Sequence, residues 1–350
     1  AGSSAGAAAA TASGLAAMSI GMETAPEAAE LIGPAGVAGV VGLKPTVGLV
    51  SRDGVLPVAK SQDTLGTLTR TVVDAALQLK IIAGPDAADP ATATAPPIPD
   101  YLAGLTPGAI AGKRIAIVAS TVVPYQTAVS TLTAAGATTV TVSFGAPLPN
   151  PPSIVSREFK RDLDTYLADT RGQAAKSLQQ IIDYNTANPV EGLKYRQAEL
   201  IEAQAADLSL YLSDLQLGKA SSQALIDTVL GNGTADPADD FDAVLVPGGN
   251  ALIGSADRAG YPVLTVPAGE GTAGAGRNPI GVSFVGSAFS EADLLSIGYA
   301  FEQASAYKRR APSVTNPSMY RCVPGSEFFS GELCHPGDRL LVERDKDRRD

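Results

Sequence analysis

The side chains that most often carry covalent chemistry are unevenly distributed along this chain. It holds a single histidine, His335, and two cysteines, Cys322 and Cys334, all within the charged C-terminal stretch. A serine–histidine–aspartate relay needs a histidine inside the folded body. The three residues also match no usual zinc-ligand spacing. We therefore expect any enzymatic chemistry to run without histidine, without a metal and without a cofactor.

The two cysteines leave two alternatives open. Cys322 and Cys334 could form a disulfide if the protein is secreted, or they could remain two free thiols. The sequence decides neither this question nor the cellular compartment.

Serine is the remaining candidate for chemistry, in the turn Gly2-Ser3-Ser4 that leads into an alanine-rich segment. Taken alone, this turn is most simply a helix cap made of small residues. It is not a phosphate-binding loop, because no lysine follows at the required position. Only a longer pattern around the turn can give its serines a chemical role.

Bulk composition limits the classes of protein that could hold this turn. A chain of 350 residues with 45% hydrophobic residues is typical of a globular protein with a large core. The net charge of -10 argues against a nucleic-acid partner, which favours a basic face. Apolar stretches such as 14–21 and 36–43 are too short to span a bilayer.

Local patterns predict the elements of the first third. They indicate a helix over 5–17, a strand over 18–21, a hairpin over 49–57 and a helix over 71–83. The hairpin is centred on Asp53-Gly54. The last helix is predicted from an amphipathic stripe of Val73, Ala76, Leu77 and Ile81.

The remainder alternates between strand and helix patterns. A strand over 114–118, a helix over 127–135 and a strand over 138–144 form a β-α-β unit, which is typical of a largely parallel sheet. Helices are expected over about 156–230, where one stripe joins Ile201, Ala205, Leu208, Leu212 and Leu215. Further strands are predicted over 241–246, 263–266 and 280–285, followed by a helix over 291–304. We expect one domain over 1–312 with a linker near 84–108, and an irregular charged tail over 313–350.

Longer motifs place the opening turn in an ordered series. In chain order they include Gly2-Ser3-Ser4-x-Gly6, Gly21-x-Glu23-Thr24, Gly39-Val40-Val41-Gly42-Leu43-Lys44-Pro45-Thr46, Ser61-Gln62-Asp63-Thr64-x-Gly66 and Pro279-Ile280-Gly281-Val282-Ser283-Phe284. This series resembles the amidase signature family over roughly residues 1 to 310. The similarity is closest to the peptide-amidase branch of bacteria and fungi.

That resemblance implies an α/β fold with a mixed central β-sheet surrounded by helices, missing its N-terminal part. It also implies hydrolysis of a small-molecule or peptide amide to a carboxylic acid and ammonia or an amine. In the family a lysine accepts a proton through a serine of the Gly-Ser-Ser turn, and that serine deprotonates a nucleophilic serine in a Gly-Ser-Ile loop. A neutral amine in a desolvated site thus replaces histidine as the base.

Two residues of this catalytic set can be carried over to the chain. The bridging serine falls on Ser3, and Ser4 becomes a supporting hydrogen-bond residue. The base lysine would lie before residue 1. Lys44 matches the family's Gly-Leu-Lys-Pro element, which we interpret as structural.

The nucleophile cannot be carried over. Counting forward from Ser3 puts Glu27 at its position, and counting back from Pro34 puts Glu30 there. No serine, threonine or cysteine lies between Thr24 and Pro34. Thr24 itself matches a position before the loop, which makes it a poor substitute.

The loop that should stabilise the oxyanion has also changed. The family's Asp-Gly pair is replaced by Ala25-Pro26, and Pro26 has no backbone N–H to donate. Loss of one oxyanion donor alone costs about 3 kcal/mol of transition-state stabilisation. A glutamate at 27 or 30 adds negative charge where an anion must form. The sequence therefore predicts that this chain does not hydrolyse amides.

Three alternatives follow. The chain is an amidase by descent that has lost activity, a non-catalytic amidase-fold binding protein that keeps the pocket, or an altered or partial gene product. A hydrolase that uses Glu27 or Glu30 as general base is disfavoured, because no paired acid is identifiable. If the pocket is kept, the turn at Ser3 should face a cleft lined by residues 24–33 and 249–255.

Overall fold

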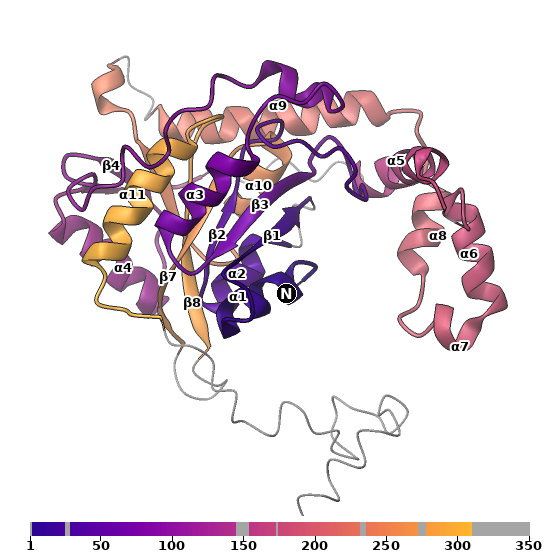
Figure 1. Cartoon of the computed structure of the whole chain (residues 1–350). Helices are drawn as coiled ribbons and strands as arrows, with labels where there is room; N and C mark the ends of the chain where they lie inside the picture. Colours follow the sequence, from indigo (N-terminus) through magenta and orange to yellow (C-terminus); the bar gives the residue numbers. More distant parts are fainter. Residues whose placement is uncertain are drawn as a thin grey trace, which may run out of the picture. The chain divides into compact units, whose positions relative to one another are not determined.

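The computed structural model describes residues 2–24, 29–144, 154–172, 174–231, 236–271 and 278–309. Within these residues the strands are β1 (Met18–Glu23), β2 (Val41–Lys44), β3 (Thr64–Thr69), β4 (Arg114–Ile117), β5 (Thr138–Thr141), β6 (Ala243–Pro247), β7 (Val263–Glu270) and β8 (Pro279–Val285). They form one sheet in the order β1-β3-β2-β7-β8-β6-β4-β5 (Figure 1).

The sheet is mixed, as the resemblance implied, and not largely parallel, as the β-α-β pattern alone suggested. Only β4 runs parallel to its neighbours, β5 and β6. The remaining pairs are antiparallel. The β-α-β unit is therefore confirmed, but it describes one end of the sheet. The other end is built from strands joined by long connections that reverse their direction.

Helices cover both faces of the sheet. The described helices are α1 (Ala5–Ser13), α2 (Ile32–Ala38), α3 (Val72–Ile82), α4 (Val123–Ala134), α5 (Ile154–Asp169), α6 (Leu178–Ala187), α7 (Pro189–Gly192), α8 (Ala198–Gln204), α9 (Tyr211–Leu230), α10 (Ala251–Ala259) and α11 (Glu291–Ala304). Helices α3, α4 and α11 pack against one face, and α1, α2 and α10 pack against the other. The two apolar cores on either side of the sheet hold the elements that carry the candidate site.

The predicted helical segment between β5 and β6 is confirmed as α5 to α9. Leu163, Leu167, Leu178, Ile182 and Ala203 form a small apolar core among α5, α6 and α8. The long helix α9 packs instead on α10, beside the sheet. The segment thus combines a small helical lobe with one helix that belongs to the main body.

The stripe predicted to run from residue 201 to residue 215 is wrong. Helix α8 ends at Gln204 and α9 begins at Tyr211, so no single helix joins these positions. Asp207 accepts the backbone N–H of Ser209 at 2.8 Å, which forms a local turn between the two helices. Leu212, one of the predicted stripe residues, is 66% exposed.

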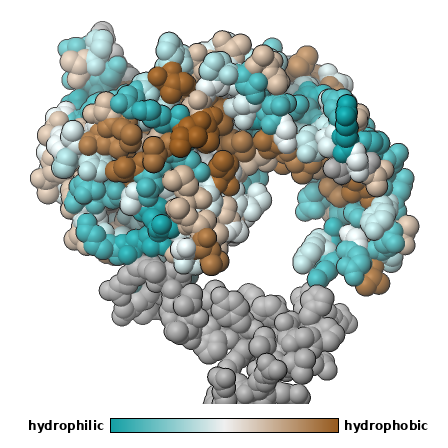
Figure 2. All heavy atoms as spheres, in the orientation of Figure 1, coloured by the Kyte–Doolittle hydropathy of each residue, from teal (hydrophilic) through white to brown (hydrophobic). Residues whose placement is uncertain are grey.

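Helix α3 is confirmed, but its predicted buried face is wrong except at Ala76. Val73, Leu77 and Ile81 are exposed and form an apolar patch over α3 (Figure 2). The buried face includes a polar residue, Gln78, whose side-chain amide donates to the carbonyl of Ser19 at 3.2 Å. That long-range hydrogen bond makes burial of a glutamine possible, and no local pattern reveals it.

The predicted hairpin turn over 49–57 is confirmed as a turn but not as a hairpin. A turn is present, with the N–H of Val55 donating to Arg52 O at 3.1 Å and Gly54 at a φ of 72°. No paired strands flank it within the described residues. The sequence patterns also missed β2, β3, α2 and α10.

Two further predictions concern the ends of the domain. Residues 313–350 lie outside the described residues, as do Cys322, Cys334 and His335. The segment over 84–108 includes a short 3-10 helix (Pro90–Thr94) and a buried tyrosine, Tyr101. None of the described helices combines the length and the apolar character that crossing a bilayer requires.

Candidate active site

The turn that opens the chain is attached to the end of β1. The Oγ of Ser4 donates to Met22 O at 3.2 Å and accepts from Met22 N at 3.1 Å. A Cβ on Gly21 would lie 2.8 Å from that Oγ, so glycine leaves the room that the hydroxyl needs. The N–H of Ser4 donates to Glu30 O at 2.9 Å. Ser4 is therefore a positioning residue that joins the turn to β1 and to the segment before α2.

Ser3 differs from its neighbour in every contact. It is exposed, its peptide bond to Gly2 is cis, and its hydroxyl forms no hydrogen bond with any described residue. The hydroxyl is thus open to a group outside the described residues or to a ligand.

Glu23, at the end of β1, lies beneath the segment that leads into α2. Its carboxylate is fully buried and accepts three backbone N–H groups, from Glu30 at 2.5 Å and from Leu31 and Ile32 at 2.9 Å each. Burial raises the pKa of Glu23, while the N–H groups of Ile32 and Leu31 act in the opposite direction. One carboxylate therefore satisfies three successive N–H groups in the segment that leads into α2.

A second carboxylate closes the same loop from the other side. The side chain of Glu30 accepts the N–H of Thr24 at 2.7 Å, across residues 25–28. The hydroxyl of Thr24 donates to Asp63 at 2.5 Å, and Asp63 also accepts the N–H groups of Val58 and Ala59 at 3.0 Å each. The two ends of the loop and the segment before β3 are thereby joined.

These bonds account for nearly all backbone donors in the described part of the loop. The N–H groups of Thr24 and of residues 30–32 are bound by Glu23 and Glu30, and Gly33 donates to Ala29 O at 2.9 Å. Pro34 has none to donate. Across residue 24 and residues 30–34, no N–H is left to hold an oxyanion.

Ala29 has an unusual backbone conformation for its side chain. Its φ is 46°, in the left-handed region that glycine tolerates best. It directly precedes Glu30. A glycine would suit the backbone at position 29 better than the alanine that is present.

Lys44 joins β2 to the end of α10. Its buried Nζ donates to Tyr261 O at 2.5 Å and to Ala256 O at 3.3 Å, and it lies 3.8 Å from an Oδ of Asp257. Burial lowers the pKa of Lys44 and raises that of Asp257. These contacts fit the structural role that we predicted for Lys44.

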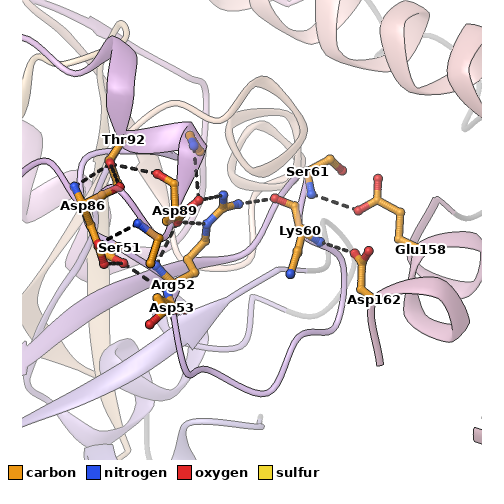
Figure 3. A network of polar contacts seen from close by, with 12 residues as sticks. Ser51, Arg52, Asp53, Lys60, Ser61, Asp86, Asp89, Thr92, Glu158 and Asp162 are labelled. Atoms are coloured by element: carbon orange, nitrogen blue, oxygen red, sulfur yellow. Dashed lines mark hydrogen bonds and ion pairs between the residues drawn. The ribbon is translucent and has the colours of Figure 1, made fainter. Parts of the chain in front are cut away.

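A polar network holds the loop that leads to Asp63 (Figure 3). Arg52 forms a bidentate ion pair with Asp89, at 2.7 and 2.8 Å, which lowers the pKa of Asp89 to about 2. From α5, Asp162 accepts the N–H of Lys60 at 3.0 Å and Glu158 accepts that of Ser61 at 2.9 Å. The helical lobe is therefore bonded to the same loop whose Asp63 holds Thr24.

The structure thus brings together three residues that the sequence singled out, namely Ser4, Thr24 and Glu30. Ala25, Pro26 and Glu27 lie outside the described residues. Sequence reasoning missed Glu23 and Asp63 as site residues, although both belong to the quoted motifs. Each is an acidic residue at the edge of a strand within a family motif. That position was the signal that could have identified them. Within the described chain, no group of three or more histidine, cysteine, aspartate or glutamate residues is placed to hold a metal.

Comparison with known proteins identifies the family. A sequence model of the amidase family matches residues 1–252. A probable amidase of Arabidopsis thaliana is 33% identical over 330 residues, which cover 88% of this chain and 60% of the relative. A glutamyl-tRNA(Gln) amidotransferase subunit of Thermosynechococcus vestitus is 31% identical over 352 residues, covering 89% of this chain and 69% of the relative.

Solved structures agree with the sequence matches. The native peptide amidase of Stenotrophomonas maltophilia superposes with a TM-score of 0.79 at 36% identity, covering 89% of this chain and 66% of that one. An amidase family protein from Bacillus anthracis also gives a TM-score of 0.79, at 28% identity, covering 89% and 61%. The chain therefore spans less than two thirds of the length of the plant relative and of both solved proteins.

Proposed function

The chain belongs to the amidase signature family, and on that premise we propose that it descends from hydrolases of carbon–nitrogen amide bonds but no longer hydrolyses amides itself. The parent reaction converts a small-molecule or peptide amide to a carboxylic acid and ammonia or an amine. In this chain Ser3 keeps the bridging position of the Ser-Ser-Lys set, while the nucleophile is replaced.

The geometry of the loop supports a choice between the two possible positions of the nucleophile. The family places a glycine immediately before the nucleophilic serine, and Ala29 occupies a backbone conformation that favours glycine. That agreement supports counting back from Pro34, which puts Glu30 at the nucleophile position. The N–H of Ser4 also donates to Glu30 O, so the residue lies beside the opening turn.

The observation that supports loss of activity is the use of the loop's donors. Between Thr24 and Pro34, the described N–H groups from residue 30 onward are bound within the protein. An oxyanion formed there would meet bound donors and two nearby carboxylates, those of Glu23 and Glu30. Transition-state stabilisation depends on donors aimed at the developing charge, and negative charge close by opposes it.

Thr24 is the residue that could contradict this proposal, since its hydroxyl donates to a carboxylate at 2.5 Å. Two features weigh against a nucleophilic Thr24. It is 1% exposed, and Asp63 already accepts two backbone N–H groups besides the hydroxyl. The pair is better suited to holding the loop than to attacking an amide.

The proposal is tested by fluorophosphonate labelling of the purified chain, with mass mapping of any modified residue and a panel of simple amides. We expect neither label nor turnover. Labelling at Ser3, Ser4 or Thr24 together with turnover would show a displaced nucleophile and contradict the proposal.

A gain-of-function experiment tests the register separately. The paired changes Ala29→Gly and Glu30→Ser are placed in a chain extended at its N-terminus by the lysine-bearing segment of an active relative. Labelling at position 30 is expected, whereas Glu27→Ser in the same extended chain serves as the matched control. If the label appears only in the Glu27→Ser variant, the nucleophile position is that of Glu27 and not that of Glu30.

A further inference from the structure

A cavity of about 260 Å³ lies between the loop before β3 and the helical lobe. Its lining residues come from three elements, and they are Val58, Val155, Ser156, Phe159, Glu199, Leu200, Glu202 and Ala203. None of the described residues of the nucleophile loop (residues 24–34) takes part. The volume is slightly below the roughly 300–1,000 Å³ of sites for drug-sized ligands, so the occupant must be small.

The lining combines an apolar wall with two carboxylates. Valine, phenylalanine, leucine and alanine side chains from α5, α8 and Val58 form the wall. Glu199 and Glu202 stand one turn apart on α8, on the same side of that helix. Among the described residues, no lysine or arginine lines the cavity, and no ion pair uses either glutamate.

The position of one carboxylate is set by a neighbour. Ser156, on α5, donates its hydroxyl to Glu202 at 3.3 Å, so the two helices share a polar contact at the cavity. Negative charge next to an apolar wall favours a ligand that carries a positive charge on an apolar body. The aromatic ring of Phe159 adds a surface that attracts cations.

We propose that this cavity is a binding site for small hydrophobic amines, whose ammonium group lies at Glu199 and Glu202 and whose apolar body contacts Phe159 and Leu200. Charge selects the ligand class, because an anion of the same shape would meet two carboxylates and no cation. The site goes beyond the proposed loss of amidase activity and does not depend on it.

The site is bonded to the candidate active site through one loop. Val58, in the cavity wall, donates its N–H to Asp63 at 3.0 Å, and Asp63 accepts the hydroxyl of Thr24. The side chain of Asp63 thus contacts both the cavity wall, at Val58, and the start of the nucleophile loop, at Thr24. An occupant is therefore expected to affect the Thr24 environment as well as the lobe.

The test uses 2-phenylethylamine as the probe, with 3-phenylpropionate and 2-phenylethanol as anionic and neutral probes of similar shape. Binding to the full chain is measured by titration calorimetry and by methyl NMR of Val155 and Leu200. We expect one-to-one binding of the amine, with affinity at least about tenfold above that of either control probe.

The variant Glu199→Gln/Glu202→Gln removes the charge while keeping the shape. Both side chains are exposed, so folding should be retained, as circular dichroism would verify. We expect the amine to bind about tenfold more weakly. Glu191→Gln, an exposed change on α7 outside the cavity, is the matched control and should bind like the unchanged chain.

Four results would overturn the proposal. They are equal binding of the amine and either control probe, unchanged amine affinity in the double variant, shifts at methyl groups away from Val155 and Leu200, and no amine binding at roughly millimolar concentration. All of them are independent of fluorophosphonate labelling, so failure here and failure of the proposed function remain distinguishable.

Discussion

Glu23 and Glu158 are buried glutamates that hold backbone segments, and they differ in how their charge is balanced. Glu23 accepts three N–H groups before α2, and the lysine that stabilises its charge, Lys44, is itself bonded to carbonyl oxygens of Ala256 and Tyr261. Glu158 accepts one N–H, from Ser61, and the hydroxyl of Tyr211, and Arg161 lies 3.7 Å away.

This difference shows two ways to keep a carboxylate inside a protein. Several backbone donors can stabilise it where no cation is in contact, as at Glu23. A hydroxyl and a partly exposed arginine can do so where the site borders the surface, as at Glu158. In the first arrangement one side chain binds three consecutive backbone N–H groups of the nucleophile loop. In the second arrangement, Glu158 and Asp162 each bind one backbone N–H of the loop before β3.

The largest expected effect is therefore at Glu23. Glu23→Ala leaves three buried N–H groups unpaired and should lower the free energy of unfolding by about 3–5 kcal/mol. Urea unfolding followed by circular dichroism measures the change, with the exposed change Glu191→Ala as control. A loss below about 1 kcal/mol would mean that the loop finds other partners for its donors.

At Glu158 the expected loss is smaller and more local. Glu158→Ala should lower the free energy of unfolding by about 2 kcal/mol, because Asp162 still binds Lys60 beside the lost contact. Hydrogen exchange should accelerate at the amides of Lys60 and Ser61. Unchanged exchange at both amides would show that α5 does not hold this loop in solution.

Glu302 extends the comparison to a carboxylate with a single backbone donor. It accepts only the N–H of Val72 among the described residues, and burial raises its pKa to about 7. The unfolded chain loses this proton near pH 4.5, so stability is present at low pH and is lost as pH rises toward 7.

Glu302→Gln mimics the protonated carboxyl and should flatten that pH dependence. Above pH 7 the variant is expected to be more stable than the unchanged chain by about 1 kcal/mol, since the side chain is partly exposed to water. Unfolding curves at pH 5 and pH 8 provide the measurement. If the unchanged chain is equally stable at both values and the variant behaves identically, the raised pKa is wrong.

The smallest expected effect is at Ala29, in the segment that Glu23 holds. Ala29→Gly removes the strain of an alanine in the left-handed region but raises the conformational entropy of the unfolded chain. The free energy of unfolding should increase by about 0.5–1 kcal/mol. The midpoint of thermal unfolding should rise slightly. Ala38→Gly, at the last residue of α2, is the control, and it should lower the midpoint. A fall in both variants would remove the support for Glu30 as the nucleophile position.

Some features were predictable from sequence because they depend on residues close along the chain. The β-α-β unit and α11 follow from local hydrophobic periodicity. The family follows from ordered motifs that begin with Gly2-Ser3-Ser4. The predicted loss of the nucleophile rests on the absence of serine, threonine and cysteine between residues 24 and 34.

Other features were decided only by the tertiary structure. Gln78 is buried while Ile81 is exposed, because the acceptor of Gln78 is Ser19, far away in the chain. Glu23 serves the start of α2 because folding brings the end of β1 beneath it. A local pattern indicates which side chains prefer to be buried. Contacts between distant segments decide which face of a helix is buried and which residues become hydrogen-bond partners.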